Sequence, residues 1–221
     1  MRFCAFFGVR FTTMEFKEIN TGDCKEFNEA MELYTDAFPA SERHSVSVIS
    51  QRVTDGLSKM YVASSNSEIV FLALLWPLKT TEFILLDYMA TKASHRGKGI
   101  ASAFLTELRE RLGNTNSYLI MEVENSKFGD DRKEKEKRIT FYKRQGAKEL
   151  EGIRYLLPPL NGTIPTEMIL MIFPEYRSEE ISGAVVKNVI VRLYRELYDR
   201  REDDALLGTF IHDIGDRIKL V

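Results

Sequence analysis

The chain has 221 residues, of which 44% are hydrophobic, so it can bury a substantial core as one large domain or as a domain with an appendage. Its 31 basic and 33 acidic side chains give a formal net charge of −2, which argues against nucleic acid or an anionic membrane as a partner. The two cysteines, Cys4 and Cys24, lack metal or redox spacing and indicate a reduced, cytoplasmic setting. No apolar run approaches the roughly 18 residues of a membrane span.

The first 13 residues faintly resemble a signal peptide. Their apolar stretch is short, Arg10 interrupts the segment beyond it, and no small-x-small cleavage site is evident. Met14 stands immediately before Glu15–Ile19, whose alternation is typical of a first strand. We therefore predict that residues 1–13 are an extension outside the main fold.

Apolar periodicity predicts the remaining elements in chain order. A helix capped by Thr21 or Asp23 runs to about Phe38, and a second helix covers about Val48 to Leu57. Six strands follow these two helices: Met60–Ala63, Ile69–Trp76, Phe83–Ala90, Tyr118–Val123, about Ala147–Arg154 and Glu167–Phe173. Among them, one helix begins after Gly99 and another ends near Gly146. This alternation predicts an α/β fold: a mixed, strongly twisted sheet with helices on both faces.

The last 45 or so residues lie beyond these strands, an estimate from approximate element boundaries. Apolar residues recur every four positions from Ser178 to about Arg200, which predicts an amphipathic helix. The helix either packs on its own sheet or forms a homodimer contact or a lid. We assign residues 14–174 to the main domain and 175–221 to a C-terminal helical extension.

The most informative stretch of the chain is Arg96-Gly97-Lys98-Gly99-Ile100-Ala101, between an apolar strand and an amphipathic helix. Two glycines at a helix start let the backbone approach a bulky anion, and the free N–H groups of the first turn point at that anion. Arg96 and Lys98 add positive charge. The stretch therefore indicates a pyrophosphate-binding loop.

Spacing separates the pyrophosphate-binding families that use such a loop. A P-loop requires an upstream glycine and Ser/Thr after Gly-Lys; here Gly99 follows Lys98, which excludes that motif. A dinucleotide fingerprint fits Gly97 and Gly99 but meets Ser102 in its third place, and the loop from Thr91 to His95 replaces the tight turn that it needs. This second interpretation is the weaker one.

A third pattern, Arg/Gln-x-x-Gly-x-Gly/Ala, is satisfied by Arg96, Gly99 and Ala101. Here the sequence resembles the GNAT superfamily of acetyl-CoA-dependent N-acyltransferases. Met89-Ala90-Thr91 stands where members commonly read Leu-Ala-Val. Farther along, Phe141–Ala147 resembles the family's Phe/Leu-Tyr-x-x-x-Gly-Phe segment. The resemblance covers roughly residues 14 to 173 and implies a GNAT-type sheet.

By this resemblance, acetyl-CoA is the co-substrate. The backbone of Met89, Ala90 and Thr91 is expected to hold the acetyl carbonyl and the pantetheine arm. The pyrophosphate is expected at the loop residues Arg96, Gly97, Lys98, Gly99, Ile100, Ala101 and Ser102. The resemblance implies no metal.

Tyr142 matches the family position that often protonates the leaving thiolate. A phenol of pKa about 10 can donate a proton to a thiolate of pKa near 8.5. Glu122 and, ranked after it, Asp87 are the candidate general bases, because an acid flanked by apolar strand residues needs a partner or a cleft. A structural ion pair of Glu122 with Arg138 or Lys143 is the competing interpretation.

Acceptor contacts in this superfamily usually come from the first two helices and the late strand loop. Here Glu42 would favour a cationic amine and Arg43 a carboxylate-bearing acceptor; His44, Arg154 and Tyr155 are further candidates. The leading hypothesis is an N-acetyltransferase acting on a primary amine of a small molecule or of a protein or peptide terminus. The alternative is a catalytically silent acyl-CoA-binding sensor or interaction module.

Overall fold

The computed structural model describes residues 14–160 and 162–221, so the predicted extension 1–13 lies outside the described residues. The first half of the chain runs through β1 (Lys17–Ile19), α1 (Lys25–Ala37), η1 (Ala40–Glu42), α2 (Val46–Thr54), β2 (Lys59–Ser65), β3 (Glu68–Pro77), β4 (Phe83–Thr91), η2 (Ala93–His95) and α3 (Ile100–Thr115). The second half continues through β5 (Tyr118–Glu124), α4 (Arg132–Arg144), β6 (Lys148–Glu149), β7 (Tyr155–Leu157), β8 (Thr166–Phe173), β9 (Glu180–Ser182), α5 (Gly183–Glu196), α6 (Ala205–Gly208), η3 (Ile211–Asp213) and β10 (Arg217–Lys219).

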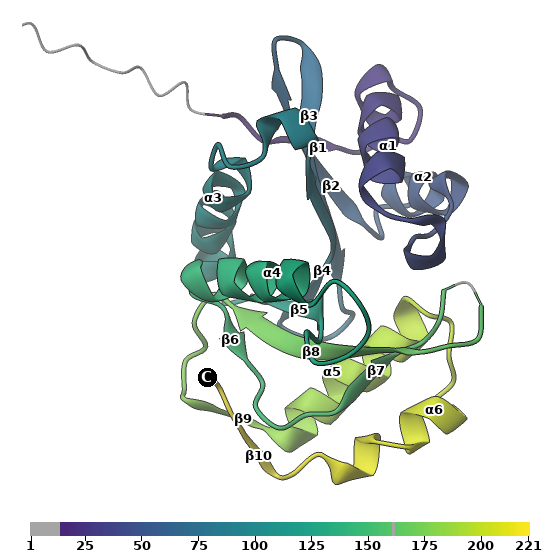
Figure 1. Ribbon diagram of the computed structural model, residues 1–221, viewed down its shortest axis with the longest axis vertical. Helices are drawn as coiled ribbons and strands as arrows, with labels where there is room; N and C mark the ends of the chain where they lie inside the picture. Colours follow the sequence, from purple (N-terminus) through teal and green to yellow (C-terminus); the bar gives the residue numbers. More distant parts are fainter. Residues whose placement is uncertain (1–13, 161) are drawn as a thin grey trace, which may run out of the picture.

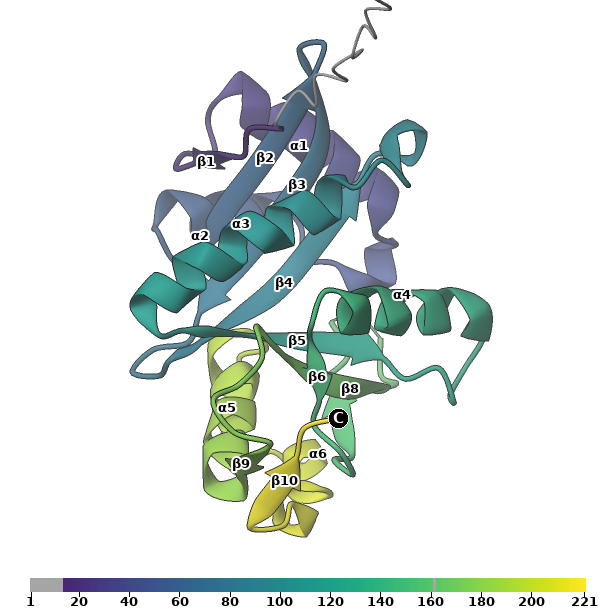
Figure 2. The ribbon, with the colours of Figure 1, turned by 90° about the vertical axis from the view of Figure 1, so that its left-hand side faces the viewer.

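The main sheet has the strand order β1-β2-β3-β4-β5-β8-β6, and β7 also pairs with β8. Its pairs are antiparallel except β4 with β5, which is parallel. Helix α3 covers one face, while α1 and α2 cover the opposite face of the N-terminal half (Figure 1). Figure 2 shows α3 in front of β3 and β4, with α4 beside β5. The predicted mixed sheet with helices on both faces is confirmed.

The two central strands separate after a short contact. In the described chain, β4 pairs with β5 only through Phe83–Leu85, which face Tyr118–Ile120. Beyond Leu85, this edge of β4 pairs with no strand of the described chain. The sheet therefore opens into two arms, and the edge of β4 facing the gap carries backbone groups available for another molecule.

A β-bulge lies where the two strands separate. Leu74 pairs with Tyr88 and Leu75 with Leu86, so Asp87 has no opposite residue. A bulge puts one extra residue into a strand and breaks the alternation of its faces. Alternation without a bulge predicts Asp87 and Met89 on one face and Tyr88 on the other. The bulge reverses the placement of Asp87. Its carboxyl group contacts Arg52 of α2, on the side where Tyr88 packs, whereas Met89 packs on the α3 side.

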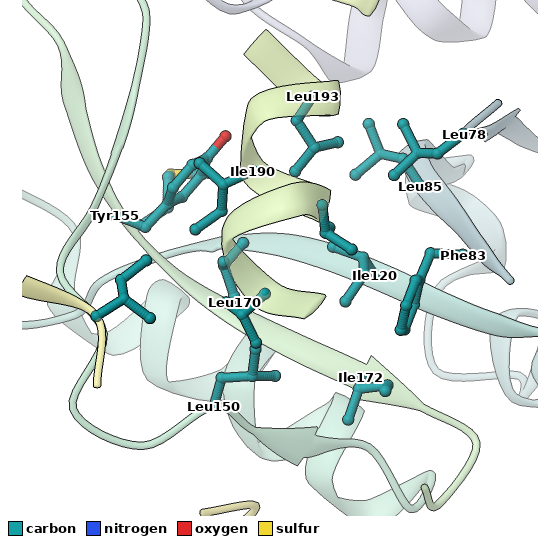
Figure 3. Packing of buried hydrophobic residues seen from close by; sticks show 14 of the residues in the cluster. Leu78, Phe83, Leu85, Ile120, Leu150, Tyr155, Leu170, Ile172, Ile190 and Leu193 are labelled. Carbon is teal, nitrogen blue, oxygen red and sulfur yellow. The ribbon is translucent and has the colours of Figure 1, made fainter. Parts of the chain in front are cut away.

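The C-terminal helix packs on the sheet. Its buried side chains, among them Ile190 and Leu193, join a cluster with Leu85 of β4, Ile120 of β5 and Leu170 of β8 (Figure 3). Of our two interpretations of this helix, packing on its own sheet is the one that the structure shows; a dimer contact through it stays a prediction.

Three predicted elements differ in detail. The strand predicted at about Ala147–Arg154 is reduced to β6, because the chain turns at Gly152 with a φ of +75°, and β7 begins only after the predicted range. The amphipathic helix begins only at Gly183, since the residues before it form β9 and pair with β10. The N-cap of α1 is Cys24, whose sulfur accepts from the Phe27 N–H, and not Thr21 or Asp23. Among the described residues, no helix is long and apolar enough to cross a membrane.

Candidate functional site

The glycine loop, which we define as Arg96–Ser102, leads from η2 into α3. Gly97 and Gly99 have φ values of +75° and +80°, a conformation that other residues rarely adopt. Gly99 is the N-cap of α3 and provides no side-chain cap. Within the described chain, the backbone N–H groups from Gly97 to Ser102 donate no hydrogen bond. The loop thus presents a row of free donors at the positive end of a helix dipole.

The space beside the two glycines of the glycine loop is open. A Cβ atom built on Gly97 or Gly99 would meet no described atom within 4 Å, so both glycines serve the backbone conformation and leave room outside it. The Arg96 Nε donates to the carbonyl oxygen of Thr91 at 3.1 Å and ties the loop to the end of β4. This arrangement suits a pyrophosphate group held by backbone donors.

Tyr142 lies in the last turns of α4. Its residue is partly exposed, and its ring packs against that of Phe141 with centroids 5.3 Å apart. Burial of the hydroxyl group raises the pKa of Tyr142 to about 12, although Arg138 acts in the opposite direction. In the described chain this hydroxyl has no hydrogen-bond partner. A protonated phenol without a partner is suited to donate to a developing anion.

The two candidate bases lie where β4 and β5 separate. Asp87 sits on the bulge, and its Oδ2 is 3.8 Å from Nη1 of Arg52; the Asp87 side chain is 8% exposed. Glu122 follows the last β4–β5 pair by two residues and is partly exposed. Tyr155 of β7 donates to its Oε1, and Tyr198, just after α5, donates to its Oε2 at 2.6 Å. We call these five residues the acid site.

Both carboxyl groups of the acid site titrate far above their ordinary range. Burial raises the pKa of Asp87 to about 7, which Arg52 partly offsets and the charge of Glu122 reinforces. Burial also raises the pKa of Glu122 to about 7, against the hydrogen bonds from Tyr155 and Tyr198. A carboxyl group that gains and loses a proton near neutral pH is suited to act as a general base.

The competing interpretation of Glu122 is wrong. Arg138 pairs with Glu124 at 2.7 Å, and Lys143 pairs with Glu149 at 2.9 Å, so neither cation is the partner of Glu122. Its partners are two tyrosine hydroxyls. Tyr155 is also fully buried, which removes it from the candidate acceptor contacts and makes it a hydrogen-bond donor to Glu122.

The predicted acceptor residues occupy different settings. Glu42, at the end of η1, is exposed and borders a pocket of about 340 Å³ with Glu124, Asp130, Asp131, Glu134, Lys135 and Arg138. Partial burial, with the nearby charge of Glu124, raises the pKa of Glu42. Arg43 instead donates to the carbonyl oxygens of Thr35 and Phe38 at 3.3 and 2.6 Å. Its guanidinium group thereby caps the end of α1.

Sequence reasoning missed Arg52 and Tyr198 as members of the site. Arg52 lies on a short helix and Tyr198 follows the C-terminal helix, and neither belongs to a recognisable motif. An arginine between apolar positions of a helix is the one signal that the sequence offers for Arg52. Nowhere in residues 14–160 and 162–221 do three His, Cys, Asp or Glu side chains gather in a way that could hold a metal ion.

Comparisons with known proteins place this geometry in a family context. Residues 56–146 match a family model described as the acetyltransferase (GNAT) domain. That match contains β4, the glycine loop, Glu122 and Tyr142. No curated protein matches the chain by sequence.

Solved structures share the fold at low identity. A protein from Bacteroides thetaiotaomicron described as a GNAT-family acetyltransferase is 22% identical, with a TM-score of 0.69 over 83% of this chain and 98% of that one. An aminoglycoside 6′-N-acetyltransferase complexed with coenzyme A is 16% identical, with a TM-score of 0.57 over 74% of this chain and 99% of that one. The ribosomal-protein-S18-alanine N-acetyltransferase of Escherichia coli is 17% identical, with a TM-score of 0.52 over 75% and 97%.

Proposed function

We propose that this chain, whose residues 56–146 match the acetyltransferase (GNAT) domain model, transfers the acetyl group of acetyl-CoA to a primary amine of a small molecule or of a protein terminus. The single observation that carries the proposal is the row of free N–H groups from Gly97 to Ser102 beside the open edge of β4. These two backbone features suit the pyrophosphate and the acyl-pantetheine arm of one extended ligand.

Residues of this chain take distinct parts in the proposed binding of acetyl-CoA. Backbone donors of the glycine loop hold the pyrophosphate, and each such contact gains on the order of 0.3–2 kcal/mol from the helix dipole. The charges of Arg96 and Lys98 add to that attraction. Met89, Ala90 and Thr91 pair with β3 on one edge of β4, and the edge toward β5 is open; their backbone holds the pantetheine arm and polarises the acetyl carbonyl.

The transfer requires three proton movements: two protons leave the amine nitrogen, and one reaches the departing thiolate. An alkyl amine of pKa near 10 is largely protonated at neutral pH, so a base must take its proton before or during attack. We assign this part to Glu122, with Asp87 second, directly or through water. The neutral amine nitrogen then bonds to the carbonyl carbon, the carbon–sulfur bond breaks, and Tyr142 protonates the departing CoA thiolate. The nitrogen of the new amide releases its second proton, which returns to the Tyr142 oxygen through water, and Glu122 releases the first proton to solvent.

We rank Glu122 above Asp87 by the groups that face each carboxyl. Asp87 faces the Arg52 guanidinium group, a permanent cation that favours the ionised form and makes Asp87 the weaker base, whereas the partners of Glu122 are two neutral tyrosine hydroxyls. On the acceptor side, Glu42 and the acidic residues around it favour an ammonium group over a carboxylate. We also expect a cytoplasmic location, which the sparse cysteines of the sequence suggest.

The proposal is tested by release of free CoA from acetyl-CoA against polyamines, aminoglycosides, amino acids and N-terminal peptides. A specific acceptor, with turnover that depends on Tyr142, is the expected result. Tyr176→Phe is the matched control, because Tyr176 is a buried tyrosine whose hydroxyl contacts Glu82 and Arg177, and its ring belongs to a different hydrophobic cluster from Ile100 of the glycine loop. Tight binding of acetyl-CoA without turnover on any acceptor would favour the sensor alternative, and absence of CoA binding would overturn both.

A further inference from the structure

The turn that ends the C-terminal helix reaches into the acid site. Tyr198 donates its hydroxyl hydrogen to Oε2 of Glu122 at 2.6 Å, while Tyr155 serves the other carboxylate oxygen. Tyr155 belongs to β7, which pairs within the main sheet. Tyr198 comes from the C-terminal extension, because it follows α5, beyond the last strand of that sheet. A residue of the extension thus provides half of the hydrogen bonds to the candidate base.

The residue before Tyr198 connects the same turn to the second carboxyl group. The carbonyl oxygen of Leu197 accepts from Nη2 of Arg52 at 3.1 Å. Nη1 of that guanidinium group faces Oδ2 of Asp87 at 3.8 Å, and the group lies over the Trp76 ring at 4.9 Å from its centroid. The backbone of the turn therefore orients the cation that faces Asp87.

Glu196 fixes the turn to the sheet. Its Oε2 accepts from the backbone N–H of Lys79 at 3.2 Å and from Nε1 of Trp76 at 3.5 Å, and its Oε1 pairs with Arg192 at 3.2 Å. The Glu196 side chain is 7% exposed. A buried carboxylate with partners on both oxygens is well held. Three consecutive residues, 196–198, therefore anchor to the sheet, to Arg52 and to Glu122.

We propose that Glu196–Tyr198 is a positioning turn of the active site, in which the Tyr198 hydroxyl holds Glu122 in the orientation and charge state that accept the proton of the acceptor amine. This inference rests on the proposed function in one respect, namely that the proton that Glu122 accepts comes from the acceptor amine. Tyr198 acts through Glu122 and is a positioning residue.

The direction of its effect follows from the groups that face Glu122. Four titratable groups face Glu122: Asp87 of β4, Tyr155 of β7, Tyr194 of α5 and Tyr198 of the turn after α5. The charged group of Arg52, from α2, lies on the far side of Asp87. The hydroxyl of Tyr198 stabilises the ionised carboxylate, so it lowers the pKa of Glu122 against the effect of burial. Removal of that hydroxyl should therefore raise the pKa of Glu122, because burial and the negative charge of Asp87 both favour the protonated carboxyl group.

The first experiment compares Tyr198→Phe with the matched control Tyr194→Phe. Tyr194 is a buried tyrosine of α5, the helix that precedes Tyr198, and its hydroxyl donates to the carbonyl oxygen of Leu156 and not to a carboxylate. With the acceptor fixed, we expect Tyr198→Phe to move the acidic limb of the kcat/KM profile upward by about one pH unit, as loss of a hydrogen bond to a charged group does. Tyr194→Phe should leave the limb in place. In a Glu122→Gln background, Tyr198→Phe should change kcat/KM by less than about twofold, because its target is gone.

The second experiment does not depend on turnover. The side-chain carboxyl carbon of Glu122, labelled with ¹³C and assigned by its absence in Glu122→Gln, is titrated by NMR in the wild-type protein and both tyrosine variants. A higher midpoint in Tyr198→Phe alone supports the proposal; equal midpoints in wild type and Tyr198→Phe overturn it. If the wild-type protein transfers no acetyl group, the proposed function fails, while this titration still decides whether Tyr198 sets the charge state of Glu122.

Folding is checked by circular dichroism. If Tyr198→Phe unfolds, 3-fluorotyrosine at position 198 replaces it, since this residue keeps the ring and donates a stronger hydrogen bond. The midpoint of Glu122 should then fall below that of the wild-type protein. An unchanged midpoint would contradict the proposal.

Discussion

The glycine loop and the acid site are built in opposite ways. The loop is one continuous segment whose free N–H groups would bind the ligand, so its binding properties depend on adjacent residues and their φ values. The acid site is assembled from side chains on α2, β4, β5, β7 and the turn after α5. A backbone site tolerates changes of side chain, whereas an assembled site depends on each distant contribution. The comparison predicts that substitutions in the acid site and at Tyr142 cost more activity than those in the loop.

After the loss of Glu122 itself, the largest expected effect on the chemical step is the loss of the proton donor. Tyr142→Phe should lower kcat roughly 10²-fold or more while leaving the affinity for acetyl-CoA nearly unchanged, because the ring still packs and only the proton donor is lost. Steady-state kinetics with a fixed acceptor measures kcat, and calorimetry measures the affinity. Tyr176→Phe should match the wild type in both. A loss of less than about threefold would remove Tyr142 from the mechanism.

The acid site should reduce stability at high pH. The folded-state pKa of Glu122 is about 7, above its ordinary value of 4.5, so the folded state holds the proton more tightly. This contribution to stability is fully present below about pH 4.5 and is lost as pH rises through about 7. Glu122→Gln should therefore raise the free energy of unfolding relative to wild type at about pH 8, on the order of 1–3 kcal/mol, and much less at about pH 4.5. Urea titrations of both proteins at both pH values measure this. An equal difference in unfolding free energy between variant and wild type at the two pH values would contradict the prediction.

Adding a side chain at Gly183, the first residue of the C-terminal helix, should lower the stability of the protein. A Cβ atom on Gly183 would overlap the carbonyl oxygen of Gly215, and backbone cannot move aside as a side chain can. Gly183→Ala should destabilise the protein by about 2 kcal/mol, as overpacking does, and lower Tm by roughly 4–8 °C. Gly208→Ala is the control, since a Cβ there meets nothing within 4 Å. Equal Tm values for the two variants would show that the backbone at Gly215 moves aside without a cost in stability.

The smallest expected effect is on the glycine loop. Gly99→Ala should weaken acetyl-CoA binding about fivefold, because an alanine with a φ of +80° is strained by roughly 1 kcal/mol while the backbone donors remain. Gly113→Ala, in the same helix and without a positive φ, should bind as tightly as wild type. Calorimetric titration with acetyl-CoA distinguishes them. A hundredfold loss in Gly99→Ala would show that the loop is as intolerant as the acid site.

Sequence reasoning succeeds where the signal is local. The sequence predicts the strand before the glycine loop, the loop and α3 nearly residue for residue, because apolar periodicity and two glycines define them. The structure also places Tyr142 at the end of α4, just before the glycine that ends the helix. The general fold is predictable from the order of these elements.

The rest depends on contacts across the chain. Nothing adjacent to Asp87 marks a bulge, since a bulge arises from the register of β4 against β3. Tyr198 is 76 residues from Glu122 in sequence, and Tyr155 is 33 residues from it. Periodicity describes the C-terminal helix by its apolar face, so it does not indicate a polar turn that reaches a carboxylate. The partners of buried acids are fixed by tertiary packing, which one sequence does not display.

The central claim is that Glu122 accepts the proton of the acceptor amine, and the pH dependence of kcat/KM tests it most directly. For the wild-type protein, we predict an acidic limb with an apparent pKa near 7, which belongs to the coupled pair of Glu122 and Asp87. In Glu122→Gln, the limb should disappear and kcat/KM should fall about 10³-fold, within the usual range for a general base. A Glu122→Gln variant that keeps both the limb and the wild-type rate would contradict the claim.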